Sequence, residues 1–197
     1  EEIVVKDIIL VLDTSGSMAG QKIAQAKAAL QQVLQSLRPQ DRFGLLTFAT
    51  EARPFEDKLL AANTTNVRRA TDYVGKLEAA GSTALNDALV QAVTLADSDG
   101  GERPAMIMFL TDGLPTQGER DPERILKNVA KANQTDNPDR PDERLARLFI
   151  FGVGGVKSNA APLLEEGVPV STMTDPVPHA LVLTAIVIGF ATSALFL

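Results

Sequence analysis

The 197-residue sequence contains no cysteine, no tryptophan and only one histidine, His179. Without cysteine the chain cannot form disulfides, thiolate zinc sites or a cysteine nucleophile. The compartment stays open, because secreted proteins can also lack cysteine. Histidine-dependent chemistry has a single candidate, and the prolines around His179 favour a loop or interfacial position over catalysis.

Positive charge is also in short supply. There are 19 Lys and Arg against 25 Asp and Glu, which gives a formal net charge of −6. No local basic stripe is visible, so the sequence argues against a nucleic-acid partner. The hydrophobic fraction of 45% excludes a wholly disordered chain, and the length corresponds to one domain with a remainder.

Short apolar runs alternate with helical stripes over the first 155 residues. Strands are expected at 8–12, 43–48, 105–110 and 148–151, with an edge segment near 54–55. Helical stripes of apolar residues lie at 23–37, 67–77, 85–96 and 125–130. Buried strands separated by helices predict an α/β fold with a doubly wound, mostly parallel sheet and helices on both faces.

The C-terminal residues have a different composition. Residues 180–197 carry no charge, and as a helix they would extend about 27 Å, enough for a thin bilayer core. We expect residues 1–156 to form the folded domain, 157–178 a linker and 179–197 a hydrophobic transmembrane helix. The alternative is a C-terminal helix buried against the sheet. We therefore expect the chain to be membrane-associated. The side of the membrane stays unassigned, because no Lys or Arg flanks the segment and no N-terminal signal peptide is visible.

Polar oxygen side chains follow the first expected strand. In Asp13-Thr14-Ser15-Gly16-Ser17 the carboxylate and the two serine hydroxyls are spaced by two residues, so in an extended loop they point to one side. One carboxylate with two hydroxyls suits Mg²⁺ or Mn²⁺ better than a soft metal. Taken alone, the pattern is equally compatible with a helix N-cap and incidental polar neighbours.

Two further loops carry matching chemistry. Asp112 leaves the strand at 105–110, and Thr83 lies in the Gly81-Ser82-Thr83 break between two helices. Ligands of open α/β sheets bind beyond the carboxyl ends of the strands, where such loops meet. If the loops converge, the predicted metal ligands are Asp13, Ser15, Ser17, Thr83 and Asp112. Three of these are neutral, so the metal would keep positive character and attract a carboxylate from another molecule.

These motifs resemble the von Willebrand factor type A domain with its metal-ion-dependent adhesion site. The resemblance rests on Asp13–Met18, Gly81–Thr83 with Asn86–Leu89, and Thr111–Gly113. Gly20–Ile23, Arg38–Phe43 and Asp121–Leu126 are similar to the inter-alpha-trypsin-inhibitor heavy-chain-like branch. It covers about residues 5–155 and implies a doubly wound fold, a divalent metal at the five residues, and a protein partner that offers an acidic side chain. It does not imply catalysis.

The sequence departs from that family after Gly155. Residues 161–167 and 175–190 resemble the small C subunit of multisubunit cation/proton antiporters, which would place them in a membrane. The sheet would then lack its last strand and leave an exposed edge.

Three functions follow from these patterns. The first is a metal-dependent, membrane-anchored adhesion-type binding module. The second is a fragment or fusion of an antiporter subunit in which the A domain is an accessory module. A Mg²⁺-dependent hydrolase ranks last, because no base is evident beyond the ligands themselves. We therefore expect no enzymatic activity.

Overall fold

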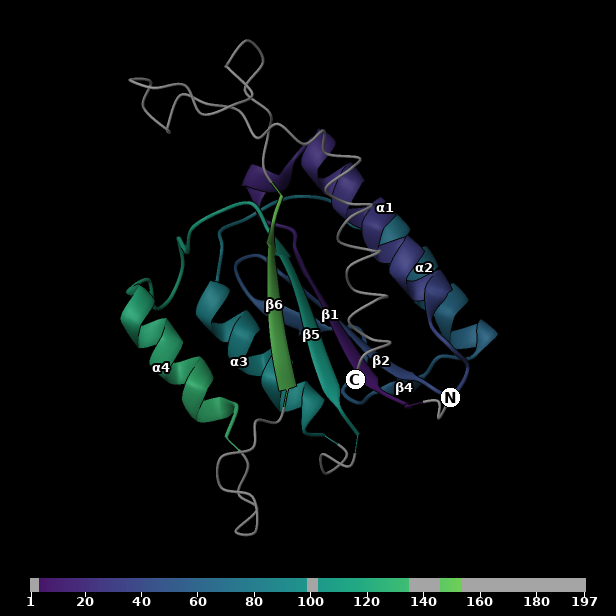
Figure 1. The fold of residues 1–197 in the computed structure, drawn as a ribbon. Coiled ribbons are helices and arrows are strands. Elements are labelled where there is room, and N and C mark those ends of the chain that lie inside the picture. The colour runs from purple at the N-terminus through teal and green to yellow at the C-terminus, as the bar shows by residue number, and fades with distance from the viewer. Residues whose placement is uncertain (1–3, 99–102, 135–145, 154–197) are drawn as a thin grey trace, which may run out of the picture. The chain divides into compact units, whose positions relative to one another are not determined.

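The computed structural model of the chain describes residues 4–98, 103–134 and 146–153 (Figure 1). The expected linker at 157–178 and the expected hydrophobic helix at 179–197 lie outside these residues, and so does the antiporter-like stretch. Within the described ranges no helix is long and apolar enough to cross a bilayer.

Four parallel strands make up most of the sheet. They are β1 (Asp7–Asp13), β2 (Arg42–Phe48), β5 (Ala105–Thr111) and β6 (Ala146–Gly152). The order is β3-β2-β1-β5-β6, and the short strands β3 (Ala52–Pro54) and β4 (Leu60–Ala61) both pair antiparallel with β2. The mostly parallel sheet is confirmed.

Helices lie on both sides of this sheet. Figure 1 shows α1 (Gln21–Ser36) and α2 (Thr64–Lys76) on one side, with α3 (Leu85–Ala96) and α4 (Pro122–Ala132) on the other. Side chains cap two of these helices: that of Asn63 accepts from Asn66 N, and that of Asp121 accepts from Arg124 N. Each cap satisfies a backbone N–H that has no partner within its helix.

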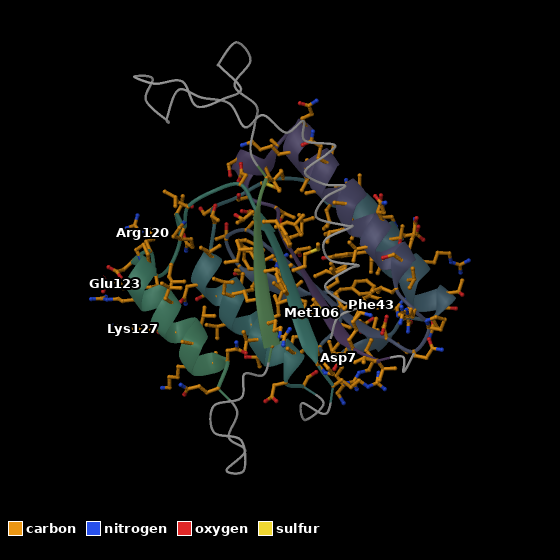
Figure 2. The ribbon with its side chains drawn as sticks, in the orientation of Figure 1. Asp7, Phe43, Met106, Arg120, Glu123 and Lys127 are labelled. Carbon is orange, nitrogen blue, oxygen red and sulfur yellow. The ribbon has the colours of Figure 1, made fainter. Side chains whose placement is uncertain are left out.

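The central strands are buried on both faces, as their unbroken apolar runs predict. Side chains alternate along each strand, so Ile9, Val11, Ile107 and Phe109 pack with α3 on one face. Figure 2 shows Phe43 and Met106 among the central strands, whereas Arg120, Glu123 and Lys127 lie at the outer side of α4. The sheet, with its buried apolar side chains, therefore lies between the two layers of helices.

Some details differ from the sequence prediction. The apolar stripe of α4 is narrower than expected: Ile125 and Val129 are buried, but Leu126 is 69% exposed. A two-residue strand, β4, was not expected, because so short a segment has no measurable periodicity. β6 also extends beyond the predicted 148–151 at both ends.

The order of the strands fixes where a ligand can bind. The chain passes from β1 to β2 on one side and later returns to β5 on the other side of β1. The direction in which successive strands are added to the sheet therefore reverses between β1 and β5. These two strands are parallel, so their carboxyl ends lie at the same end of the sheet. Open α/β sheets bind their ligands at this reversal.

Candidate metal-binding site

Asp13 is the last residue of β1, and its residue surface is 0% exposed. Its Oδ1 accepts the backbone N–H of Ser15 at 2.8 Å, and its Oδ2 accepts the hydroxyl of Thr111 at 2.6 Å. Thr111 is the last residue of the neighbouring strand β5. The Asp13 carboxylate is therefore oriented by the loop that follows β1 and by the last residue of β5.

A row of hydroxyls continues from there to the second aspartate. The hydroxyls of Ser15 and Ser17 lie 3.0 Å apart, and the Ser17 hydroxyl donates to Asp112 Oδ1 at 2.8 Å. The side chain of Asp112 is only 1% exposed. These hydrogen bonds connect four of the five predicted ligands, Asp13, Ser15, Ser17 and Asp112, and each of the four takes part through its side chain. They link the carboxyl ends of β1 and β5.

The helix-cap alternative for this loop is not supported. A 3₁₀ turn at Gly16–Met18 follows Ser15, and α1 begins only after Gly20, whose φ of 79° suits glycine. Ser15 is the N-cap of the 3₁₀ turn and Gly20 is the N-cap of α1, and neither element is capped by a side-chain hydrogen bond. The oxygens of Ser15 and Ser17 therefore face the site instead of capping α1.

The loop containing Thr83 is attached to the first loop through backbone hydrogen bonds. Gly16 N donates to Gly81 O at 3.0 Å, and Ala80 N donates to Thr14 O at 2.8 Å. A Cβ added at Gly16 would lie 3.5 Å from Gly81 O, which is an ordinary van der Waals contact. The third loop therefore meets the first, as the sequence predicts.

Thr83 itself is held from the β5 side. Its N–H donates to the Thr116 hydroxyl at 2.8 Å, and its carbonyl accepts the N–H groups of Thr116 and Gln117. Thr83 is 3% exposed. The loops that carry the five predicted residues are therefore all connected to one another.

Two residues with contacts to this site lie in motifs noted in the sequence, but neither was predicted as a site residue. Thr111 orients Asp13, and Lys22 on α1 places its Nζ 2.5 Å from Asp112 Oδ2. A threonine beside the strand-end aspartate was a possible signal for the first. Nothing local identifies Lys22, because its partner lies 90 positions away.

The donor set is made of oxygen only, which fits Mg²⁺ or Mn²⁺. No group of three or more His, Cys, Asp or Glu residues that could hold a metal occurs in the described part of the chain. A cation at this site would therefore depend on Asp13 and Asp112 together with serine and threonine hydroxyls.

One carboxylate in the loop before α4 has a shifted pKa. The pKa of Glu119 is lowered, mainly because the backbone N–H of Asp121 donates to the carboxylate, with smaller contributions from Arg120 and Arg124. Hydrogen bonds to the charged form favour ionisation. Glu119 therefore helps to hold the turn that leads into α4.

The model of the von Willebrand factor type A domain matches residues 7–164, which include the whole site. The chain belongs to this family. The family assignment made from the motifs is confirmed, and so is its branch. This von Willebrand A domain is 41% identical over 133 residues to human inter-alpha-trypsin inhibitor heavy chain H4 and 36% identical over 155 residues to pig heavy chain H2.

These alignments cover only a small part of the relatives. The H4 alignment spans 64% of this chain and 14% of the human protein, and the H2 alignment spans 76% and 16%. The relatives therefore support the domain and not the activity of a whole heavy chain. The antiporter resemblance of the C-terminal residues stays a prediction.

Solved structures share the fold. A von Willebrand factor type A protein from Catenulispora acidiphila has a TM-score of 0.61 at 23% identity, and the match covers 75% of this chain and 39% of that one. The pilus adhesin SpaC from Lactobacillus rhamnosus GG has a TM-score of 0.52 at 24% identity, over 59% and 16%. At such identities the likeness shows the architecture alone.

Proposed function

We propose that this von Willebrand A domain is a protein-binding module that uses a divalent metal to bind an acidic side chain of its partner. The observation that carries the proposal is the hydrogen-bonded row from Asp13 through Ser15 and Ser17 to Asp112. It gathers hard oxygen donors at the reversal point of the sheet. Mg²⁺ is the first choice of ion, with Mn²⁺ as the alternative.

The proposed ligands divide into charged and neutral donors. Asp13 and Asp112 supply two negative charges, and Ser15, Ser17 and Thr83 supply neutral oxygens. When bound, the metal would supply a positive centre for a carboxylate from the partner. The pilus adhesin SpaC, which shares this fold, is also an adhesion protein.

Binding is a better match to these residues than hydrolysis. The sequence has no cysteine, and its single histidine lies in the C-terminal region. The Lys22 amine, the nearest basic group, is paired with Asp112. A nucleophile with an adjacent base is therefore not apparent among the described residues.

We further propose that residues 180–197 attach the chain to a membrane. The support is their uncharged apolar composition over 18 residues. Membrane fractionation of the full chain and of a chain ending at residue 178 tests this. The full chain should require detergent for extraction, whereas equal recovery of both chains in the aqueous fraction would contradict the proposal.

Calorimetric titration of Mg²⁺ and Mn²⁺ into the full chain tests the metal site. Asp13→Asn and Asp112→Asn should each abolish measurable binding, whereas Asp72→Asn, a change at an exposed carboxylate on α2, should leave the affinity unchanged. A chemical-shift titration with acetate, a small carboxylate, should perturb the site only when Mg²⁺ is present. Equal acetate shifts in EDTA and in Mg²⁺ would contradict the proposal.

A further inference from the structure

We propose that Lys22 sets the charge of this site, so that it weakens the hold on the metal and strengthens the hold on an acidic ligand. The inference rests on the proposed metal-dependent function. It assigns a specificity-determining role to a residue outside the five predicted ligands.

The position of Lys22 follows from the start of α1. Gly20 precedes the helix, and Lys22 is its second residue, so the side chain lies beside the loop that carries Ser17. Its Nζ donates to Asp112 Oδ2 at 2.5 Å and to the Ser17 carbonyl at 3.2 Å. The Lys22 side chain is 34% exposed, whereas that of Asp112 is 1% exposed.

The two oxygens of Asp112 therefore face different groups. Oδ1 accepts from the Ser17 hydroxyl, which belongs to the row of proposed metal ligands, and Oδ2 accepts from Lys22. Because the ammonium lies on the other oxygen, Lys22 and a cation at the hydroxyl row can share one carboxylate. Lys22 can stay in place when the metal binds.

The charge of the loaded site then depends on Lys22. Asp13 and Asp112 contribute two negative charges, and Lys22 contributes one positive charge. A dication brings the sum to about +1 with Lys22 and to about zero without it, by simple addition of formal charges. The ammonium thus leaves the loaded site cationic.

Opposite effects on two ligands follow. A nearby positive charge repels the incoming dication and attracts the incoming carboxylate, and Coulomb energies scale with the product of the charges. Removal of the Lys22 charge should tighten Mg²⁺ binding about tenfold and weaken acetate binding to the Mg²⁺-loaded protein about threefold, because the dication carries twice the charge. Both effects should shrink as salt is raised, since the Lys22 side chain is partly exposed.

Variants of the full chain separate charge from structure. Lys22→Met and Lys22→Gln remove the charge, and Lys22→Gln also keeps a donor for Asp112, so it carries the test if the methionine variant does not fold. Lys22→Arg keeps the charge and should restore both affinities to near the wild-type values. Lys27→Met is the matched control, because Lys27 lies on the same helix and donates to the Leu77 carbonyl instead of to a carboxylate.

Calorimetry with Mg²⁺ and a chemical-shift titration with acetate give the two readouts. Tighter Mg²⁺ binding together with weaker acetate binding in the uncharged variants supports the proposal. Unchanged or weaker Mg²⁺ binding in these variants would overturn the role of Lys22 and leave the proposed metal site standing. Weaker binding is the result expected if Lys22 only holds Asp112 in place, because its loss would then disorganise the carboxylate. If the wild-type chain binds no Mg²⁺, the proposed function fails and this inference fails with it.

Discussion

The Ser17 hydroxyl lies 2.8 Å from Asp112 Oδ1, although 95 positions separate the two residues in the sequence. Ser17 follows β1, Asp112 follows β5, and the two strands are neighbours in the sheet. This contact closes the row of oxygens that begins at Asp13. Removing this contact by substitution of Ser17 therefore tests the whole site.

Replacement of the bridging serine should weaken metal binding and also lower the stability of the fold. In Ser17→Ala the row is interrupted, and we expect the Mg²⁺ affinity to fall by at least about tenfold, since even residues that only orient metal ligands contribute that much. Ser17→Ala also removes the donor to Oδ1 of Asp112, whose side chain is 1% exposed, so the free energy of unfolding in EDTA should fall by about 1–3 kcal/mol. Calorimetry and urea denaturation measure the two quantities. An unchanged Mg²⁺ affinity would remove Ser17 from the site.

Loss of the Thr111 hydroxyl should affect both stability and metal binding. Thr111→Val keeps the shape but removes the donor to Asp13 Oδ2, which leaves a buried carboxylate oxygen short of a partner. We expect the free energy of unfolding in EDTA to fall by about 1–3 kcal/mol and the Mg²⁺ affinity to fall by about tenfold.

A matched variant on α3 provides the control for that prediction. The Thr94 hydroxyl donates to the Val90 carbonyl within the helix, and Thr94 is exposed. Thr94→Val should therefore leave the Mg²⁺ affinity unchanged. Equal losses of affinity in the two variants would show that the threonine at the end of β5 has no special role.

Two ion pairs should differ strongly in their contribution to stability. Asp41 is 1% exposed and accepts from the Lys6 ammonium at 3.4 Å and from the backbone N–H groups of Lys6 and Arg38. Asp41→Ala leaves a largely buried lysine without this partner and should lower the free energy of unfolding by about 3–5 kcal/mol.

The comparison pair lies on the surface. Both side chains of the Glu51–Arg53 pair are more than two-thirds exposed, at 71% and 76%. Glu51→Ala should lower the free energy of unfolding by at most about 1 kcal/mol. Urea denaturation of both variants at one pH makes the comparison, and similar losses would contradict the burial argument.

Packing disfavours a side chain at one glycine of β2. A Cβ added at Gly44 would lie 2.7 Å from Leu95 Cδ2 and 3.1 Å from Leu59 Cδ2, and both leucines are buried. Gly44→Ala should lower the free energy of unfolding by about 1–3 kcal/mol through overpacking.

Gly152 offers the matched control, because among the described residues no atom beyond its two chain neighbours lies within 4 Å of a Cβ added there. Gly152→Ala should leave the free energy of unfolding nearly unchanged. A similar loss of stability at both positions, measured by urea denaturation, would show that backbone freedom and not packing against α3 limits the residue at Gly44.

Much of the fold was predictable because its signals are local. The apolar runs of β1 and β5, the caps at Asn63 and Asp121 and the polar strand ends all lie within a few residues of the elements they define. β4 was not predictable, because two residues carry no period. Leu126 has an apolar side chain at helical spacing, but it is 69% exposed, because packing and not spacing decides exposure.

By itself, the sequence determined the α/β alternation and the family, and it predicted the five oxygen-bearing residues as metal ligands, since these depend on residue type and on spacing along the chain. Only the tertiary structure decided which strands are neighbours, and therefore that Thr111 orients Asp13 and that Lys22 is paired with Asp112. The physical reason is distance: these partners lie 98 and 90 positions apart, and only the parallel pairing of β1 with β5 brings the ends of their strands together.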